Sequence, residues 1–144
     1  MEREAVAGAL RPHANANFLV DLGYGNSQGR DEGFCEVVFP EFRIDSRELA
    51  QHNGTTAPRR LILRRGVTGS LDLYAWWDEA RRGNAPRQRT VKVELLAADH
   101  STVVLTWHFR EARPVSLSYT PLNAMDGSVL IETIELEFDT MEMR

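Results

Sequence analysis

The side chains best suited to bind a metal ion or to shuttle a proton are four histidines, and their spacing favours neither role. A zinc site on a helix needs two histidines four residues apart, and no pair in this chain has that spacing. We assign them to a terminal arm, a loop, a turn and the polar face of a strand, in the order His13, His52, His100 and His108. The sequence therefore predicts no metal site.

Nucleophiles and phosphate-binding loops are equally poorly represented. The single cysteine, Cys35, lies beside Glu36 in an alternating segment, with no histidine near it in the sequence to activate it. We interpret it as a small buried apolar residue. Gly23, Gly25 and Gly29 follow a predicted strand but do not open a helix, which indicates a turn rather than a dinucleotide site. We expect no catalytic residue, no cofactor and no enzymatic activity.

The 17 basic and 21 acidic residues are unevenly distributed, although the net charge is only -4. Nine of the basic residues fall between Arg59 and Lys92, whereas the end of the chain is acidic. One interpretation is two solvated faces, and the other is contact between copies, with a basic surface meeting an acidic one. The pI of about 5.6 argues against specific binding to nucleic acid. The charged contact candidates are Arg59, Arg60, Arg64, Arg65, Arg81, Arg82, Glu132, Glu135 and Glu137.

The length of 144 residues fits one domain, which we predict over residues 15–144, after a flexible arm over residues 1–14. A domain of this size buries about 70% of the surface of its unfolded chain and can fold on its own core. No apolar run approaches the roughly 20 residues that span a bilayer, and the N-terminus lacks the apolar region of a secretory signal. We expect a protein that is made in the cytoplasm and does not insert into a membrane.

Alternation of apolar and polar residues predicts about seven strands. They fall near residues 17–24, 33–42, 59–66, 91–95, 102–110, 115–119 and 129–139. One helix is expected at about residues 70–82, where Ser70 can cap the first turn and Gly83 can end the last one. This pattern is typical of a mainly β protein, an antiparallel two-sheet β-sandwich or barrel with one packed α-helix.

The aromatic residues of the predicted helix could stack on ligand rings, but packing of the helix on the sheet is the more usual reason for them. Leu73, Trp76 and Trp77 share a stripe, with Tyr74 beside it. Neighbours on a helix lie about 100° apart, so these side chains cannot all face the core. We expect either Trp76 or Trp77 to lie at a subunit interface; two fully buried indoles would contradict this.

The order of these segments resembles that of tail tube proteins from contractile phages and contractile injection systems. RRGVTGSLDLYAWWDEARRG is similar to the family's basic strand, Gly-x-Thr turn and aromatic helix. NFLVDL and EGFCEVVFPEF resemble its first two strands, and TVKVELLAAD, VLTWHFREARPVSLSYTPLNA and VLIETIELEF resemble its later ones. The resemblance runs from about Asn17 to Phe138, which is most of the chain.

The resemblance implies a fold like that of type VI secretion tube proteins and a structural role. Hexameric rings would stack into a hollow inner tube that a contractile sheath drives into a target. The implied partners are further copies of the chain, the sheath protein, baseplate and spike proteins, other tube paralogues and cargo in the lumen. Assembly would take place in the cytoplasm, and the finished tube would belong to a tail or an injection particle.

One segment departs from the family pattern. Many members carry a longer glycine-containing loop with a Leu-Pro-Gly-type turn before the basic strand, where this chain has IDSRELAQHNGTTAPRRL. The family uses this loop for contacts between stacked rings, so the stacking candidates here are Arg47, Glu48, Gln51, His52 and Asn53. We expect either a specialised paralogue, such as a baseplate-proximal ring, or a main tube with a reshaped loop. The alternative function is a small β-sandwich module that binds a ligand or a protein.

Overall fold

The computed structural model describes residues 17–23, 33–44, 59–83 and 89–144. The predicted arm at residues 1–14 lies outside these ranges, as do Tyr24 and most of the glycine-rich turn. The whole set of stacking candidates also lies outside them, namely Arg47, Glu48, Gln51, His52 and Asn53.

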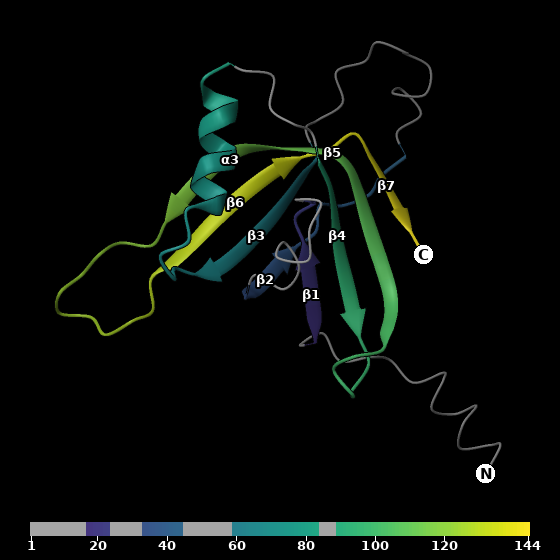
Figure 1. Cartoon of the computed structure of the whole chain (residues 1–144), viewed down its shortest axis with the longest axis horizontal. Coiled ribbons are helices and arrows are strands. Elements are labelled where there is room, and N and C mark those ends of the chain that lie inside the picture. The colour runs from purple at the N-terminus through teal and green to yellow at the C-terminus, as the bar shows by residue number, and fades with distance from the viewer. Residues whose placement is uncertain (1–16, 24–32, 45–58, 84–88) are drawn as a thin grey trace.

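The described residues form seven strands and one helix (Figure 1). In chain order these are β1 (Phe18–Asp21), β2 (Phe34–Val38), β3 (Arg60–Gly66), α3 (Asp72–Arg81), β4 (Arg89–Leu96), β5 (Val103–Tyr119), β6 (Ile131–Glu137) and β7 (Thr140–Met143). All pairings are antiparallel, in the order β1-β4-β5-β6-β3-β2, and β7 also pairs with β5. The predicted fold class, an antiparallel β protein with one helix, is confirmed.

Strand β5 belongs to two sheets. Its first part, from Val103 to Ala112, pairs with β4 and β7, and its last part, from Arg113 to Tyr119, pairs with β6. At the junction, Glu111 has a φ of 56°, in the left-handed region that L residues rarely adopt. The strand turns sharply there (Figure 1). The sequence predicted two separate strands because its alternation is interrupted at this point, but the backbone pairing continues through the bend.

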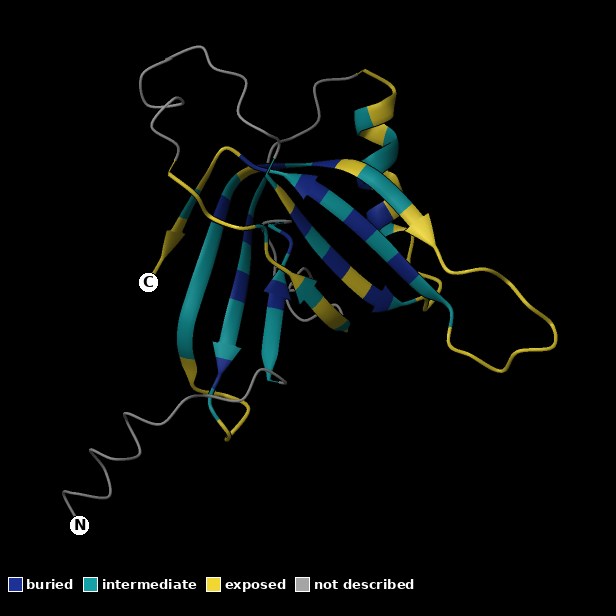
Figure 2. Cartoon of the chain, turned by 180° about the vertical axis from the view of Figure 1, so that it is seen from behind, coloured by how far each residue is buried: buried dark blue, intermediate teal, exposed yellow. Residues whose placement is uncertain are grey.

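The core lies between the two sheets. It contains Val20, Leu22, Leu61, Leu63, Leu73, Trp76, Val91, Val93, Phe109, Ala112, Ile134, Leu136 and Phe138. Figure 2 shows the buried positions of β3 and β6 recurring at every second residue. This alternation fixes the strand register, because a slip by one residue would turn the apolar face toward solvent.

Helix α3 packs against β5 and begins and ends within two residues of the predicted range. Leu73 and Trp76 are its buried residues. The expected cap by Ser70 is not formed, since Leu71 is the N-cap residue and makes no side-chain capping hydrogen bond. Ser70 Oγ only accepts a long hydrogen bond from the backbone nitrogen of Asp72, at 3.4 Å. Gly83 follows the helix with a φ of 74°, the left-handed conformation that was predicted for this position.

Two details differ from the expectations. Cys35 is exposed rather than buried, because its neighbour Phe34 packs against the core and alternation turns Cys35 to the other face of β2. There its Sγ donates to the carbonyl oxygen of Arg64 at 3.4 Å. Strand β7 was not predicted, since its four residues are too few to show a period. Within the described residues, no helix has the length and apolar character needed to cross a membrane.

Candidate subunit interface and a buried ionic cluster

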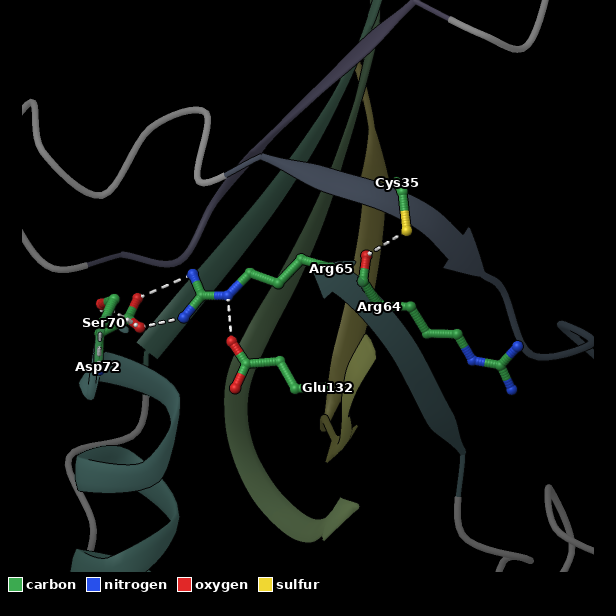
Figure 3. A network of polar contacts seen from close by, with 6 residues as sticks. All are labelled: Cys35, Arg64, Arg65, Ser70, Asp72 and Glu132. Carbon is green, nitrogen blue, oxygen red and sulfur yellow. Dashed lines mark hydrogen bonds and ion pairs between the residues drawn. The ribbon is translucent and has the colours of Figure 1, made fainter. Parts of the chain in front are cut away.

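A buried ionic cluster joins β3, β6 and the start of α3. Arg65 and Glu132 lie opposite each other in the β3–β6 register, and Arg65 Nε donates to Glu132 Oε1 at 2.6 Å. The same guanidinium reaches Asp72, where Nη1 donates to Oδ2 at 3.1 Å and Nη2 donates to Oδ1. Figure 3 shows the two carboxylates converging on the one guanidinium. One side chain therefore holds the beginning of the helix against the seam between two strands.

The position of this cluster follows from the alternation of the two strands. Arg65 shares a face with Leu61 and Leu63, and Glu132 shares a face with Ile134. Only 1% of Arg65 and 4% of Glu132 is exposed. The ring centre of Phe34 lies 5.3 Å from the guanidinium carbon, within the range of a cation–π interaction. A buried charge needs partners of this kind, and loss of one partner leaves the others uncompensated.

Electrostatics keeps Arg65 and Asp72 charged at neutral pH. Burial alone would raise the pKa of Asp72, but hydrogen bonds from Arg65 and Ser70 outweigh it and hold the pKa below its ordinary value. Burial alone would lower the pKa of Arg65, but its hydrogen bonds to Asp72 and Glu132 more than reverse this and raise the pKa. The two groups are therefore held as an ion pair across the neutral range.

Three of the interface candidates lie inside the protomer, so the expectation is wrong for them. Arg65 and Glu132 form the cluster, and Trp76 is 1% exposed in the core. Charge and aromatic character suggested surface contacts, but position on the strand or helix decides which side chains face inward. Trp77 is half-buried, with its ring centre 6.3 Å from that of Tyr74. Of the two neighbouring indoles, only Trp77 is therefore available to another subunit.

The charged candidates on the outer side of β3 and β6 pair within the chain. Arg60 lies 3.9 Å from Glu135 and 4.0 Å from Glu137, measured between nitrogen and oxygen. Arg64 binds Glu36 of β2 at 2.8 Å. The basic and acidic segments of the sequence thus meet in adjacent strands of one protomer. Exposed pairs of this kind contribute only about 0–1 kcal/mol each, so they remain open to exchange with a neighbour.

The remaining arginine candidates are also engaged locally. Arg81 and Arg82, at the end of α3, bind Asp78 at 2.6 and 2.9 Å. Arg59 is half-buried and donates to the carbonyl oxygen of Arg43 at 3.4 Å. No three histidine, cysteine or acidic side chains gather into a metal-binding group anywhere in the described ranges.

A further exposed surface lies on a loop that contains none of the predicted site residues. Loop 120–130 connects β5 to β6 and projects from one side of the molecule (Figures 1 and 2). It leaves 86% of Leu122, 94% of Met125 and 70% of Val129 exposed. The available signal was the presence of large apolar residues among the turn-forming residues of this loop.

Comparison with known proteins identifies both the family and the fold. The family model of the T4-like virus tail tube protein gp19 matches residues 15–142. No curated protein matches the chain significantly by sequence.

Solved structures also resemble this fold. One is a PVC sheath–tube complex of an extracellular contractile injection system, with a TM-score of 0.75 and 19% identity, covering 97% of this chain and 96% of that chain. A second, from the anti-feeding prophage baseplate, has a TM-score of 0.67 and 24% identity, covering 93% and 96%. A third, Hcp1 from Flavobacterium johnsoniae, has a TM-score of 0.57 and 17% identity, covering 88% and 93%. At these identities the likeness shows the fold.

Proposed function

The chain belongs to the family of T4-like virus tail tube proteins, and from that premise we propose that it is the ring-forming subunit of the inner tube of a contractile injection particle. The observation that carries the proposal is the family match over residues 15–142, which includes every described strand and the helix except the last residue of β7. In this proposal six copies close into a ring, and rings stack into a hollow tube. A contracting sheath then drives the tube into its target.

The arrangement of the strands supports assembly as the role of the protein. Strands β1 and β2 stand at the two ends of the strand order, so each has one pairing partner among the described residues. Unpaired strand edges invite uncontrolled association, and assembly into a closed ring is one way to cover them. A single heterologous contact, repeated around a cyclic axis, is sufficient to close such a ring.

The proposed partners follow from the same role. They are further copies of the chain, the sheath, the baseplate and spike proteins, other tube paralogues and cargo in the lumen. Chains of this fold occur in a sheath–tube complex and in a baseplate, which supports further copies of the chain, the sheath and the baseplate as partners. We place synthesis and assembly in the cytoplasm, and the finished tube in a tail or an extracellular particle.

The position of the chain within the tube is the finer part of the proposal. The segment IDSRELAQHNGTTAPRRL lacks the Leu-Pro-Gly-type turn expected of a ring-stacking loop, which favours a specialised ring near the baseplate. An imaging reconstruction of the whole particle tests this. Density for this chain along the full length of the tube would contradict it and would leave the role of main tube subunit.

The test of the proposed function is the assembly state of the purified protein. Negative-stain electron microscopy should show rings or tubes with a central hole, without any added ligand. Mass measurement in solution should give six times the 16.3 kDa of one chain, or a multiple of that value. A protein that stays monomeric at high concentration would contradict the proposal and would favour the small binding module.

A further inference from the structure

We propose that loop 120–130 of one copy binds a neighbouring copy on the surface formed by residues 39–44 and the end of β7. We call this second surface the receiving surface. The inference rests on the proposed tube function and assigns the contact between adjacent subunits of the ring. The partner is a second copy of this chain.

Loop 120–130 is apolar at its surface and internally ordered. Its base is closed by two hydrogen bonds between Thr120 and Ile131, at 3.0 and 2.9 Å. Within it, the backbone nitrogen of Met125 donates to Asn123 Oδ1 at 2.9 Å. The loop has a single charged residue, Asp126, which accepts hydrogen bonds from Ser128. An ordered loop loses little conformational entropy on binding, and clustered exposed apolar side chains mark interaction sites.

The receiving surface is aromatic at its base. Phe39 lies 4.9 Å from Trp107 and Phe42 lies 6.4 Å from Phe109, measured between ring centres. Both phenylalanines cover β5 on one side and remain more than one third exposed on the other. Ile44, at the end of the same segment, is 88% exposed. These side chains offer an apolar surface that the described residues of the protomer leave uncovered.

The end of β7 extends this apolar base. Met143 of β7 lies opposite Trp107 in the strand register and is half exposed. The ion pair of Arg110 with Glu142, at 2.8 Å, lies on the opposite face of these two strands, because both residues alternate with Phe109 and Met143. Exposed apolar side chains that cluster in this way mark protein–protein contacts.

The positions of the two surfaces select a second copy as the partner. Figures 1 and 2 show loop 120–130 at one end of the long axis, and the chain leaving β2 toward the opposite side. Two different surfaces on opposite sides of one protomer make a heterologous contact, which repeats from copy to copy until a ring closes. Each copy supplies one loop 120–130 and one receiving surface. A closed ring made of this chain alone therefore buries every loop and every receiving surface.

Substitutions with aspartate test the contact directly. We expect the double variant Leu122→Asp/Met125→Asp and the single variant Ile44→Asp to stay monomeric while they keep the circular dichroism spectrum of the folded protein. The control is Ala98→Asp, which adds the same charge to an exposed turn between β4 and β5 and should still form rings. Rings formed by either of the first two variants would overturn the inference. Failure of the unchanged protein to form rings would overturn the proposed function as well.

Disulfide cross-linking tests the pairing without disrupting the fold. In a Cys35→Ser background, which removes the exposed native thiol, Leu122→Cys and Ile44→Cys together should give a ladder of covalent oligomers on oxidation. A mixture of the two single-cysteine proteins should stop at a mixed dimer, because each protein has one reactive surface. Absence of the ladder in preparations that contain rings, or dimers of Leu122→Cys alone, would overturn the inference.

Discussion

Arg65 and Glu132 occupy opposed positions on β3 and β6 and share a hydrogen bond of 2.6 Å in the protein interior. Both side chains are almost fully removed from solvent, and the guanidinium continues to Asp72 at the start of α3. The cluster therefore supports the fold of each protomer. Arg65 and Glu132 therefore offer almost no surface to another copy of the chain.

Replacement of Arg65 tests how much the buried ionic cluster contributes to the free energy of unfolding. Arg65→Met leaves two carboxylates without their cation in a buried site, and we expect the free energy of unfolding to fall by about 3–5 kcal/mol. The control is Arg64→Met on the exposed side of the same strand, with an expected loss of at most about 1 kcal/mol. Urea unfolding at one fixed protein concentration measures both, since assembly would add to the apparent stability. Equal losses would contradict the assignment.

The stability of the protein should depend on pH through Asp72. Its pKa in the folded protein lies below the ordinary value of 3.8, so its contribution is complete above about pH 5 and is lost as the pH falls through the folded pKa. Asp72→Asn should therefore be less stable than the wild type at pH 7, and the difference should shrink below about pH 4. Thermal melts between pH 3 and pH 7 measure this. Glu79→Gln, on the exposed side of α3, is the control and should follow the wild type at pH 7.

The neighbouring tryptophans of α3 should differ strongly in their contribution to stability. Trp76→Ala removes a fully buried indole from the core, and the expected loss is about 3–5 kcal/mol. Trp77 is only half-buried, so Trp77→Ala should cost clearly less. Chemical unfolding of the two variants side by side gives the comparison, and a larger loss for Trp77→Ala would be inconsistent with the orientation of the helix.

The bend of β5 should be sensitive to the residue at position 111. Glu111 has a positive φ, which glycine adopts without steric cost and a β-branched residue resists. We expect Glu111→Gly to keep or raise the Tm and Glu111→Val to lower it by several degrees. Val115→Thr, at an exposed site on the same strand, should leave the Tm nearly unchanged. A higher Tm for Glu111→Val than for Glu111→Gly would contradict the bend.

Much of the fold could be predicted because the strands alternate so regularly. The same alternation that turns Leu61 and Leu63 toward the core, however, also turns Arg65 toward it. Glu132 likewise lies two residues before Ile134 and faces the same side of β6. We interpreted both charged residues as surface residues from their chemistry alone. The pairing of β3 with β6 reveals their role, because it brings opposite charges together from positions 67 residues apart.

The other missed features have equally local causes. Cys35 lies in an edge strand of five residues, where the alternation is too short to decide which face a small side chain occupies. The interruption near Glu111 indicated two strands, since a sequence does not show that a backbone can bend and keep its pairing. The residue types alone do not distinguish Leu122 and Met125 of loop 120–130 from buried apolar residues, and the fold shows that both side chains are exposed.

The shared strand β5 has a mechanical consequence for the proposed tube, which a contracting sheath would push lengthwise through a barrier. Its 17 residues run without interruption through both sheets, so covalent bonds, and not side-chain packing alone, carry a load from one sheet to the other. Sliding of the two layers past each other would require the hydrogen-bond ladders on both sides of Glu111 to break together. Each protomer should therefore yield as one unit under compression, as a rigid tube wall requires.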